Sequence, residues 1–168
     1  MGNDCSSVCV KKKKLSRKNT EENHNIAMRN SLASNRETIN EFSLKNYQQV
    51  MFLANEGNLN GVKAYLDQGF VVDFPLDQSG WTLLHLACQK GNLKLVELLL
   101  RYKPYVDAQE LAEGWTPLMV SAINNYDTIV LLLLQHGADE KLLDKTGKTM
   151  QDLATKYKSN KILDMIFS

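Results

Sequence analysis

Histidines and cysteines are the side chains of this 168-residue chain best suited to catalysis or metal binding, and it has three of each. His24 and His136 have no second ligand-type residue at the spacing that a metal site needs. No Cys-x-x-Cys pair, His-Glu-x-x-His, Gly-x-Ser-x-Gly or glycine-rich phosphate loop occurs. We therefore expect no catalytic residues, no metal and no cofactor, and a protein that is not an enzyme.

A different chemistry is predicted at the amino terminus, which reads MGNDCSSVCVKKKKLSRK. Met1-Gly2-x-x-x-Ser6 matches the N-myristoylation pattern, in which Met1 is removed and the amine of Gly2 is acylated. One myristoyl chain binds a membrane only reversibly, so stable attachment needs a second signal. Cys5 and Cys9 are predicted palmitoylation sites that would supply one. An alternative second signal is a run of cations that would be attracted to an anionic leaflet, namely Lys11, Lys12, Lys13, Lys14, Arg17 and Lys18.

The same leader has other interpretations. A cationic run also serves as a nuclear localisation signal, and a solvated tail with surface thiols has the same composition. Ser16 lies inside the cationic run and is a predicted phosphorylation site, because a phosphate there would weaken attraction to an anionic leaflet. We expect a lipid-anchored location at the cytoplasmic face of a membrane, with cytoplasm or nucleus as the alternative.

The net excess of positive charge is confined to this leader. Residues 1–18 hold six cations and one anion, a charge of +5, whereas the whole chain carries +1 and residues 19–168 therefore −4. An acidic body argues against nucleic-acid binding, which normally needs a cationic face. Three cysteines, two of them in the first nine residues, do not form a disulfide framework and predict a reducing compartment. No stretch approaches 18 uninterrupted apolar residues.

The rest of the chain repeats with a period of 33 to 34 residues. GWTLLHLA at 80–87 returns as GWTPLMVS at 114–121, and Gly147-Lys148-Thr149 follows 33 residues later. A second block, GNLKLVELLLRY at 91–102, has counterparts in the other units. The predicted organisation is a basic leader over 1–18, a polar flexible linker over 19–43 and a repeat domain over 44–168, with units at 44–76, 77–110, 111–143 and 144–168.

Each unit is predicted to hold two short helices. In the second unit, Leu84, Ala87 and Cys88 fall at i, i+3 and i+4, and the apolar run 95–100 follows the break at Gly91. Helices of this length are marginal in water, so the units must stack and bury the leucines of their neighbours. Cys88 is accordingly expected to be a small buried thiol. The predicted fold class is all-α, a solenoid of paired short helices with connecting β-turn loops.

Residues 44–168 resemble ankyrin repeats. The resemblance rests on the period, on the Gly-Trp-Thr-Leu-Leu-His and Gly-Trp-Thr-Pro-Leu starts, and on the exit His136-Gly137-Ala138-Asp139. It implies an ankyrin-repeat solenoid of about four units, in which the first and last units are atypical caps. It also implies that His85 has a structural role and bonds the Thr82 hydroxyl and backbone between repeats.

The resemblance further implies that a protein partner binds the concave surface, through the turn tips and the exposed ends of the first helices. Trp81 and Trp115 stand one repeat apart at these turns and are expected anchors, because tryptophan is enriched at binding hot spots. The alternative is that each ring packs over its own turn. The residues at the contact positions are Gln78, Ser79, Trp81, Gln89, Lys90, Ala112, Glu113, Trp115, Ile123, Asn124, Lys145, Thr146 and Lys148.

Leader and repeats together predict a function. We expect a membrane-tethered adaptor, acylated at Gly2 and at Cys5 or Cys9, that binds a protein partner through its concave surface and takes no small-molecule substrate. The alternative is a soluble or nuclear ankyrin-repeat regulator that binds and inhibits a protein partner.

Overall fold

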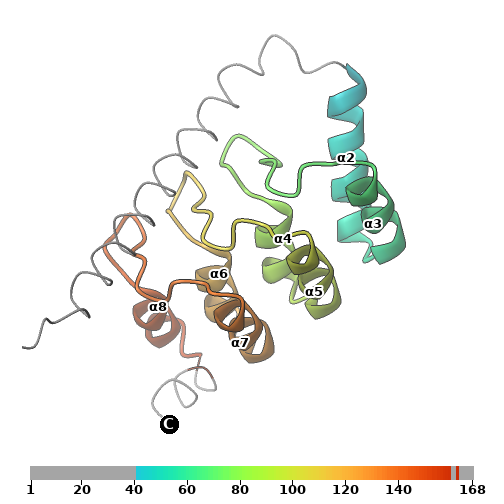
Figure 1. Ribbon diagram of the computed structural model, residues 1–168. Helices are drawn as coiled ribbons and strands as arrows, with labels where there is room; N and C mark the ends of the chain where they lie inside the picture. Colours follow the sequence, from blue (N-terminus) through green and yellow to red (C-terminus); the bar gives the residue numbers. More distant parts are fainter. Residues whose placement is uncertain (1–40, 160–161, 163–168) are drawn as a thin grey trace, which may run out of the picture. The chain divides into compact units, whose positions relative to one another are not determined.

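The computed structural model describes residues 41–159 and residue 162. The repeats lie in one compact unit that begins at Lys45. Regular structure in the described residues is entirely helical, which confirms the predicted all-α class (Figure 1). In chain order the helices are α2 (Glu41–Asn55), α3 (Leu59–Asp67), α4 (Leu83–Lys90), α5 (Leu93–Arg101), α6 (Pro117–Ile123), α7 (Asp127–Gln135) and α8 (Met150–Lys156).

A threonine cap starts the first helix of the second, third and fourth repeats. The hydroxyl oxygens of Thr82, Thr116 and Thr149 each accept a hydrogen bond from the backbone N–H three residues further on. Such a bond satisfies one of the amide groups that a helix start leaves unpaired. In α4 and α8 the side chains of His85 and Asp152 accept in return from the backbone N–H of the capping threonine. The threonine of each Gly-x-Thr start is therefore a helix-capping signal.

The second helices begin with a different residue. Asn58 and Asn92 cap α3 and α5, each accepting from the backbone N–H three residues on, at 2.9 and 3.1 Å. The corresponding residue of α7 is Tyr126, whose side chain makes no capping hydrogen bond. Its ring lies instead over Gly91, where an added Cβ would come within 2.6 Å of the ring. Tyr126 thus provides packing between two repeats, at a position where the first and second repeats have a capping asparagine.

Residues with positive φ recur at equivalent places in the repeats. Glycine adopts this conformation readily, asparagine less so, and lysine uncommonly. The backbone conformation therefore repeats with the same period as the sequence. Positive φ is kept even at repeat positions where asparagine or lysine replaces glycine. The positions are Gly57, Gly91 and Asn125 between paired helices, Lys158 after α8, Gly69, Lys103 and Gly137 after the second helix, and Gly80, Gly114 and Gly147 before the first.

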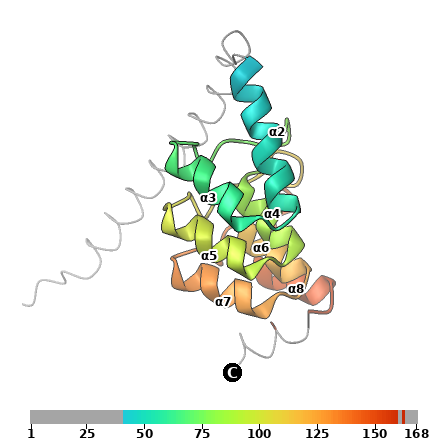
Figure 2. The ribbon, with the colours of Figure 1, turned by 90° about the vertical axis from the view of Figure 1, so that its right-hand side faces the viewer.

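The helices of the repeat unit form two layers. The first helices α4, α6 and α8 pack side by side, and the second helices α3, α5 and α7 form a parallel row against them (Figures 1 and 2). Within the second and third repeats the two helices also touch, α4 with α5 and α6 with α7. Every interior helix therefore has neighbours both in its own layer and in the other one.

The core lies between these layers, where sequence periodicity placed it. Leu84, Ala87 and Cys88 of α4 are at most 1% exposed, and Leu95 and Leu99 of α5 are equally buried. Complete burial of a leucine side chain contributes roughly 1.5–3 kcal/mol. Stacking thus stabilises helices that are too short to persist alone.

The first repeat departs from the interior pattern. Its first helix, α2, begins at Glu41, ahead of the predicted boundary at 44, and has 15 residues where α4 has 8. The ring of Tyr47 stacks on Phe74 at a centroid distance of 3.7 Å and meets Phe70 edge-on at 4.8 Å. These aromatic contacts attach the loop after α3 to α2.

The last repeat is joined to the third by a polar contact. Ser159 is 1% exposed, and its hydroxyl donates a hydrogen bond to the backbone oxygen of Ala122 at 2.7 Å. Ile162, which follows it, is fully buried. Ser159 and Ile162, which follow α8, are therefore both buried.

We expect Gly91→Ala to destabilise the repeats more than Gly137→Ala. Both glycines have positive φ, +66° and +87°. Each alanine therefore carries a backbone penalty of about 1 kcal/mol. Only Gly91 lies beneath a ring, so its new methyl group would overlap Tyr126 and cost about 1–3 kcal/mol more. Urea unfolding followed by circular dichroism measures both losses, and equal losses would contradict the packing of Tyr126 on Gly91.

Candidate partner-binding surface

A single carboxylate organises each of the three turns that precede α4, α6 and α8. In the first, Oδ1 of Asp77 accepts hydrogen bonds from the backbone N and the hydroxyl of Ser79, at 2.9 and 2.6 Å. In the last, Oδ1 of Asp144 accepts from the backbone N and the hydroxyl of Thr146, both at 2.8 Å, and from Lys148 N at 2.9 Å. Burial opposes ionisation of Asp144, but these bonds lower its pKa below the ordinary value. The turns are fixed by local side-chain bonds.

The middle turn is one residue longer and is organised by a glutamate, Glu110, which is 3% exposed. Its Oε1 accepts from Glu113 N at 2.6 Å and Trp115 N at 3.1 Å, and its Oε2 accepts from Ala112 N at 2.6 Å. A backbone bond of 3.1 Å from Glu110 N to Trp115 O closes the turn. The longer side chain spans the extra residue and preserves the arrangement seen in the shorter turns.

The three turns are hydrogen-bonded to one another. Leu111 N donates to Ser79 O at 2.5 Å, and Lys145 N donates to Glu113 O at 2.9 Å. The ammonium of Lys145 also donates to the backbone oxygen of Leu111. The turns therefore form one connected edge, whose side chains stand at a fixed spacing. We call the turns 77–81, 110–115 and 144–148, with the carboxyl ends of α4 and α6, the tip surface.

His85 connects the second repeat to the third. Its ring is completely buried, and Nδ1 lies 3.3 Å from Thr82 N and 2.9 Å from the Thr82 hydroxyl. Because Nδ1 accepts from the Thr82 N–H, Nε2 carries the proton and donates to Trp115 O at 3.1 Å. Burial lowers the pKa of His85 to about 4, and the bond to Trp115 O only partly opposes this. The imidazole is neutral at pH 7 and has the structural role that the resemblance implied.

Both tryptophans are half-buried and pack against the core. The Trp81 ring is tilted against the His85 ring, with centroids 5.5 Å apart. Nε1 of Trp115 is buried, and no acceptor in the described part of the chain meets hydrogen-bonding geometry with it. It lies close enough to Asp144 to help lower the pKa of that carboxyl. Trp81 therefore packs against the helix that follows its turn, Trp115 reaches the turn of the next repeat, and both keep part of their surface accessible.

The other predicted contact residues lie on the tip surface with more varied exposure. Ser79 is half-buried and bonded to Asp77, and Asn124 donates from Nδ2 to Val120 O at 2.8 Å. Ile123 and Lys148 are half-buried as well. The exposed residues are Gln78, Gln89, Lys90, Ala112, Glu113, Asn124, Lys145 and Thr146.

Four residues of this surface, and Leu143 directly beside it, were not predicted. The sequence signal for Asp77, Glu110 and Asp144 was an acidic residue three or four positions before each turn glycine. Leu111 and Leu143, 42% and 53% exposed, add apolar area at the turns. They had no signal, because an exposed leucine in a loop is indistinguishable in sequence from a buried one.

Ionisable groups elsewhere do not gather into a metal centre. Within residues 41–159 and 162, no three or more His, Cys, Asp or Glu side chains are placed to hold a metal ion. Cys88 is buried, and burial raises the pKa of its thiol to about 12 despite a hydrogen bond with Ser121. Its thiol is thus the inert, buried group that was expected.

The predicted acylation sites Gly2, Cys5 and Cys9, the cations of 11–18 and Ser16 lie outside the described residues. Among the helices that are described, none has the length and apolar character needed to cross a bilayer.

A family model for ankyrin repeats in three copies matches residues 21–110, 50–144 and 105–168. The chain belongs to the ankyrin-repeat family. This membership confirms the predicted fold class, and ankyrin repeats are scaffolds that bind proteins. Their stacked units create an extended surface for that purpose.

Several known proteins share these ankyrin repeats. Human protein phosphatase 1 regulatory subunit 27 is 32% identical over 106 residues, which cover 62% of this chain and 68% of that protein. The putative ankyrin repeat protein YahD of Escherichia coli (strain K12) is 37% identical over 87 residues, 49% of this chain and 43% of YahD. Mouse ankyrin repeat and SAM domain-containing protein 6 is 34% identical over 109 residues, 65% of this chain and 12% of that protein. The matched region of this chain thus covers less than half the length of YahD and of the mouse protein.

We expect the ankyrin repeats to lose stability as the pH falls from 7.5 to 5. An unfolded histidine has a pKa near 6.5, whereas that of folded His85 is about 4, so the unfolded state binds more protons in this range. The loss from His85 is about 2 kcal/mol at pH 5. Urea unfolding at both pH values measures it.

The matched control is His85→Gln, which keeps a polar side chain but has no titratable group. This variant is expected to be less stable than the wild type at pH 7.5 and to change less between the two pH values. An equally steep loss in the variant would assign the pH dependence to other groups.

Proposed function

We propose that this ankyrin-repeat protein is a membrane-tethered adaptor that binds a protein partner through its tip surface. The observation that carries the proposal is the hydrogen-bonded edge of turns, in which Lys145 is bonded to both Glu113 and Leu111. A surface whose backbone is already fixed loses little conformational entropy on binding. Its mixed character suits a protein, since exposed leucines lie beside charged and amide side chains.

The amino-terminal sequence supports the membrane tether. Gly2 meets the myristoylation pattern, and Cys5 and Cys9 are close enough to it for a second acyl chain. A myristoyl chain alone binds with a partition constant of about 10⁴ M⁻¹, and palmitate or the six cations would make attachment stable. Phosphorylation of Ser16 would weaken the cationic contribution. A tethered repeat domain would concentrate its partner at the cytoplasmic face of the membrane.

A second function is supported by the likeness to human protein phosphatase 1 regulatory subunit 27, a protein named as a regulatory subunit. In this alternative the chain is a soluble or nuclear regulator that binds and inhibits a protein partner. The cations of 11–18 would then act in nuclear import.

Localisation of the chain carrying a fluorescent protein after Ser168 separates these functions. Wild-type protein in a eukaryotic cell is expected at a membrane, and Gly2→Ala is expected to be dispersed because its terminus cannot be myristoylated. The control is Asn3→Ala, which leaves the glycine and the cations in place. An identical distribution of wild type and Gly2→Ala would contradict lipid tethering, and nuclear accumulation of both would support the regulator.

The tip surface has its own test, independent of localisation. A biotin ligase fused after Ser168 is expected to label at least one protein with the wild type that it fails to label with Lys90→Glu/Lys145→Glu. Reversed charges on an interface repel a partner and slow its association. The control, Lys141→Glu/Lys156→Glu, makes the same charge change at exposed lysines outside the tip surface. Identical labelling by all three proteins would contradict the assignment of the tip surface.

A further inference from the structure

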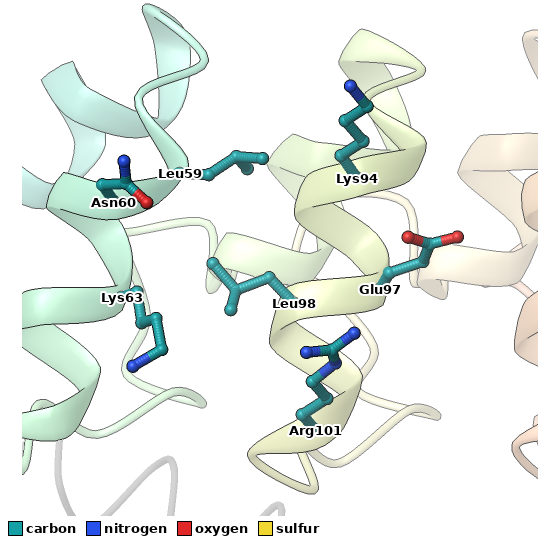
Figure 3. Close-up of a pocket in the computed structure, with 7 residues that line it drawn as sticks. All are labelled: Leu59, Asn60, Lys63, Lys94, Glu97, Leu98 and Arg101. Atoms are coloured by element: carbon teal, nitrogen blue, oxygen red, sulfur yellow. The ribbon is translucent and has the colours of Figure 1, made fainter.

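A groove of about 300 Å³ lies between α3 and α5, the second helices of the first two repeats. Leu59 and Leu98 face each other across it, and Figure 3 shows both leucines between the two helices. Both are only half-buried, although Leu98 belongs to the apolar run that was predicted to pack in the core. The groove therefore has an apolar centre that no side chain of the repeats fills.

The edges of the groove are cationic. Lys94 and Arg101 are exposed and form no ion pair with any residue of 41–159 or 162. In Figure 3 the Arg101 guanidinium is turned toward α3. The carboxylate of Glu97 is turned away from α3. Lys63, on the facing helix, adds a third cation. The groove presents two unpaired positive charges beside two leucines.

This positive charge is local and does not reflect the body of the protein. Residues 41–168 contain 12 cationic and 15 acidic residues, a net charge of −3. The next second helix, α7, has no charged side chain at the outward positions, where Thr128, Leu131 and Gln135 replace Lys94, Glu97 and Arg101. The repeat pattern alone does not produce the cationic groove, so it belongs to the first two repeats.

A network at one end holds the two walls together. Asp67 of α3 accepts from the ammonium of Lys63 at 2.6 Å and from the hydroxyl of Tyr102, which follows α5, at 2.5 Å. The bonds from Lys63 and Tyr102 lower the pKa of Asp67, so the carboxylate stays ionised at neutral pH. Asp67 thereby offsets the charge of Lys63 and leaves Lys94 and Arg101 for a ligand.

We propose that this groove, lined by Leu59, Asn60, Lys63, Lys94, Glu97, Leu98 and Arg101, binds an acidic segment of a protein partner on its three cations. Carboxylates of the segment would pair with Lys94 and Arg101, and an apolar side chain among them would lie between the two leucines. Arginine suits this role because its planar guanidinium matches a carboxylate with two parallel hydrogen bonds. The groove is on α3 and α5, elements that contribute nothing to the tip surface, so the protein can hold two partners at once.

The probe is a fluorescein-labelled peptide with one central leucine between two pairs of glutamates, titrated with the full chain at low and physiological salt. Wild type is expected to raise its fluorescence polarisation, and Lys94→Glu/Arg101→Glu is expected to weaken binding by at least about tenfold. The control is Lys141→Glu/Lys156→Glu, which has the same net charge but an unchanged groove. All three proteins keep the cations of residues 11–18, so attraction to the leader is common to them.

Amide chemical shifts of the labelled full chain show where the peptide binds. The proposal requires that the peptide change the amide chemical shifts of residues 94–101 and of α3. It also requires that the groove variant, Lys94→Glu/Arg101→Glu, have the same melting temperature as the wild type. Equal affinities of groove variant and control, or shifts confined to the tip surface or the leader, would overturn it. In a second experiment, binding of the same proteins to phosphatidylserine vesicles is measured. If the groove variant loses vesicle binding but keeps the peptide, the groove contacts membrane and the proposal is wrong.

Discussion

Mutual burial of short helices is the constraint on which this protein depends. Helices of seven to nine residues, such as α6 and α5, have too few internal bonds to persist in water. They persist because each buries apolar side chains against its neighbours, which for the interior helices lie before, after and beside it. No repeat has a core of its own. Stability is therefore shared among neighbours, and every interface must also satisfy the polar groups that stacking removes from water.

The polar groups at one such interface converge on a single carbonyl. The oxygen of Trp115 accepts a bond from Glu110 N at 3.1 Å and lies 3.1 Å from Nε2 of His85 in the preceding repeat. The first bond closes a turn, and the second joins that turn to another repeat. Through Leu111 and Lys145 the bonding continues to the neighbouring turns. The rigidity of the tip surface is thus a consequence of how buried polar groups are satisfied between repeats.

Sequence reasoning succeeded where one backbone pattern recurs and failed where contacts depend on stacking. The repeat period, the paired helices and the burial of Cys88 followed from spacing alone. Glu110 was missed, as were Asp77 and Asp144, because the backbone N–H groups that each carboxylate binds come together only when its turn has folded. Residues on separate helices, such as Lys63 and Arg101, line one groove only after two repeats have packed, and no local pattern contains that information.

Tyr126 and Gly91 carry information of another kind, about the order of the units. Near-identical repeats can in principle exchange places, or add to a second molecule end to end. The Tyr126 ring occupies space that only a residue without a Cβ leaves free, and that residue is Gly91 in the second repeat. The third repeat has Asn125 at the corresponding position, and the fourth has Lys158. The first repeat also has a glycine there, Gly57, so this contact does not distinguish the first two repeats. A third repeat that followed a copy of itself would instead press its Tyr126 ring against the Cβ of Asn125.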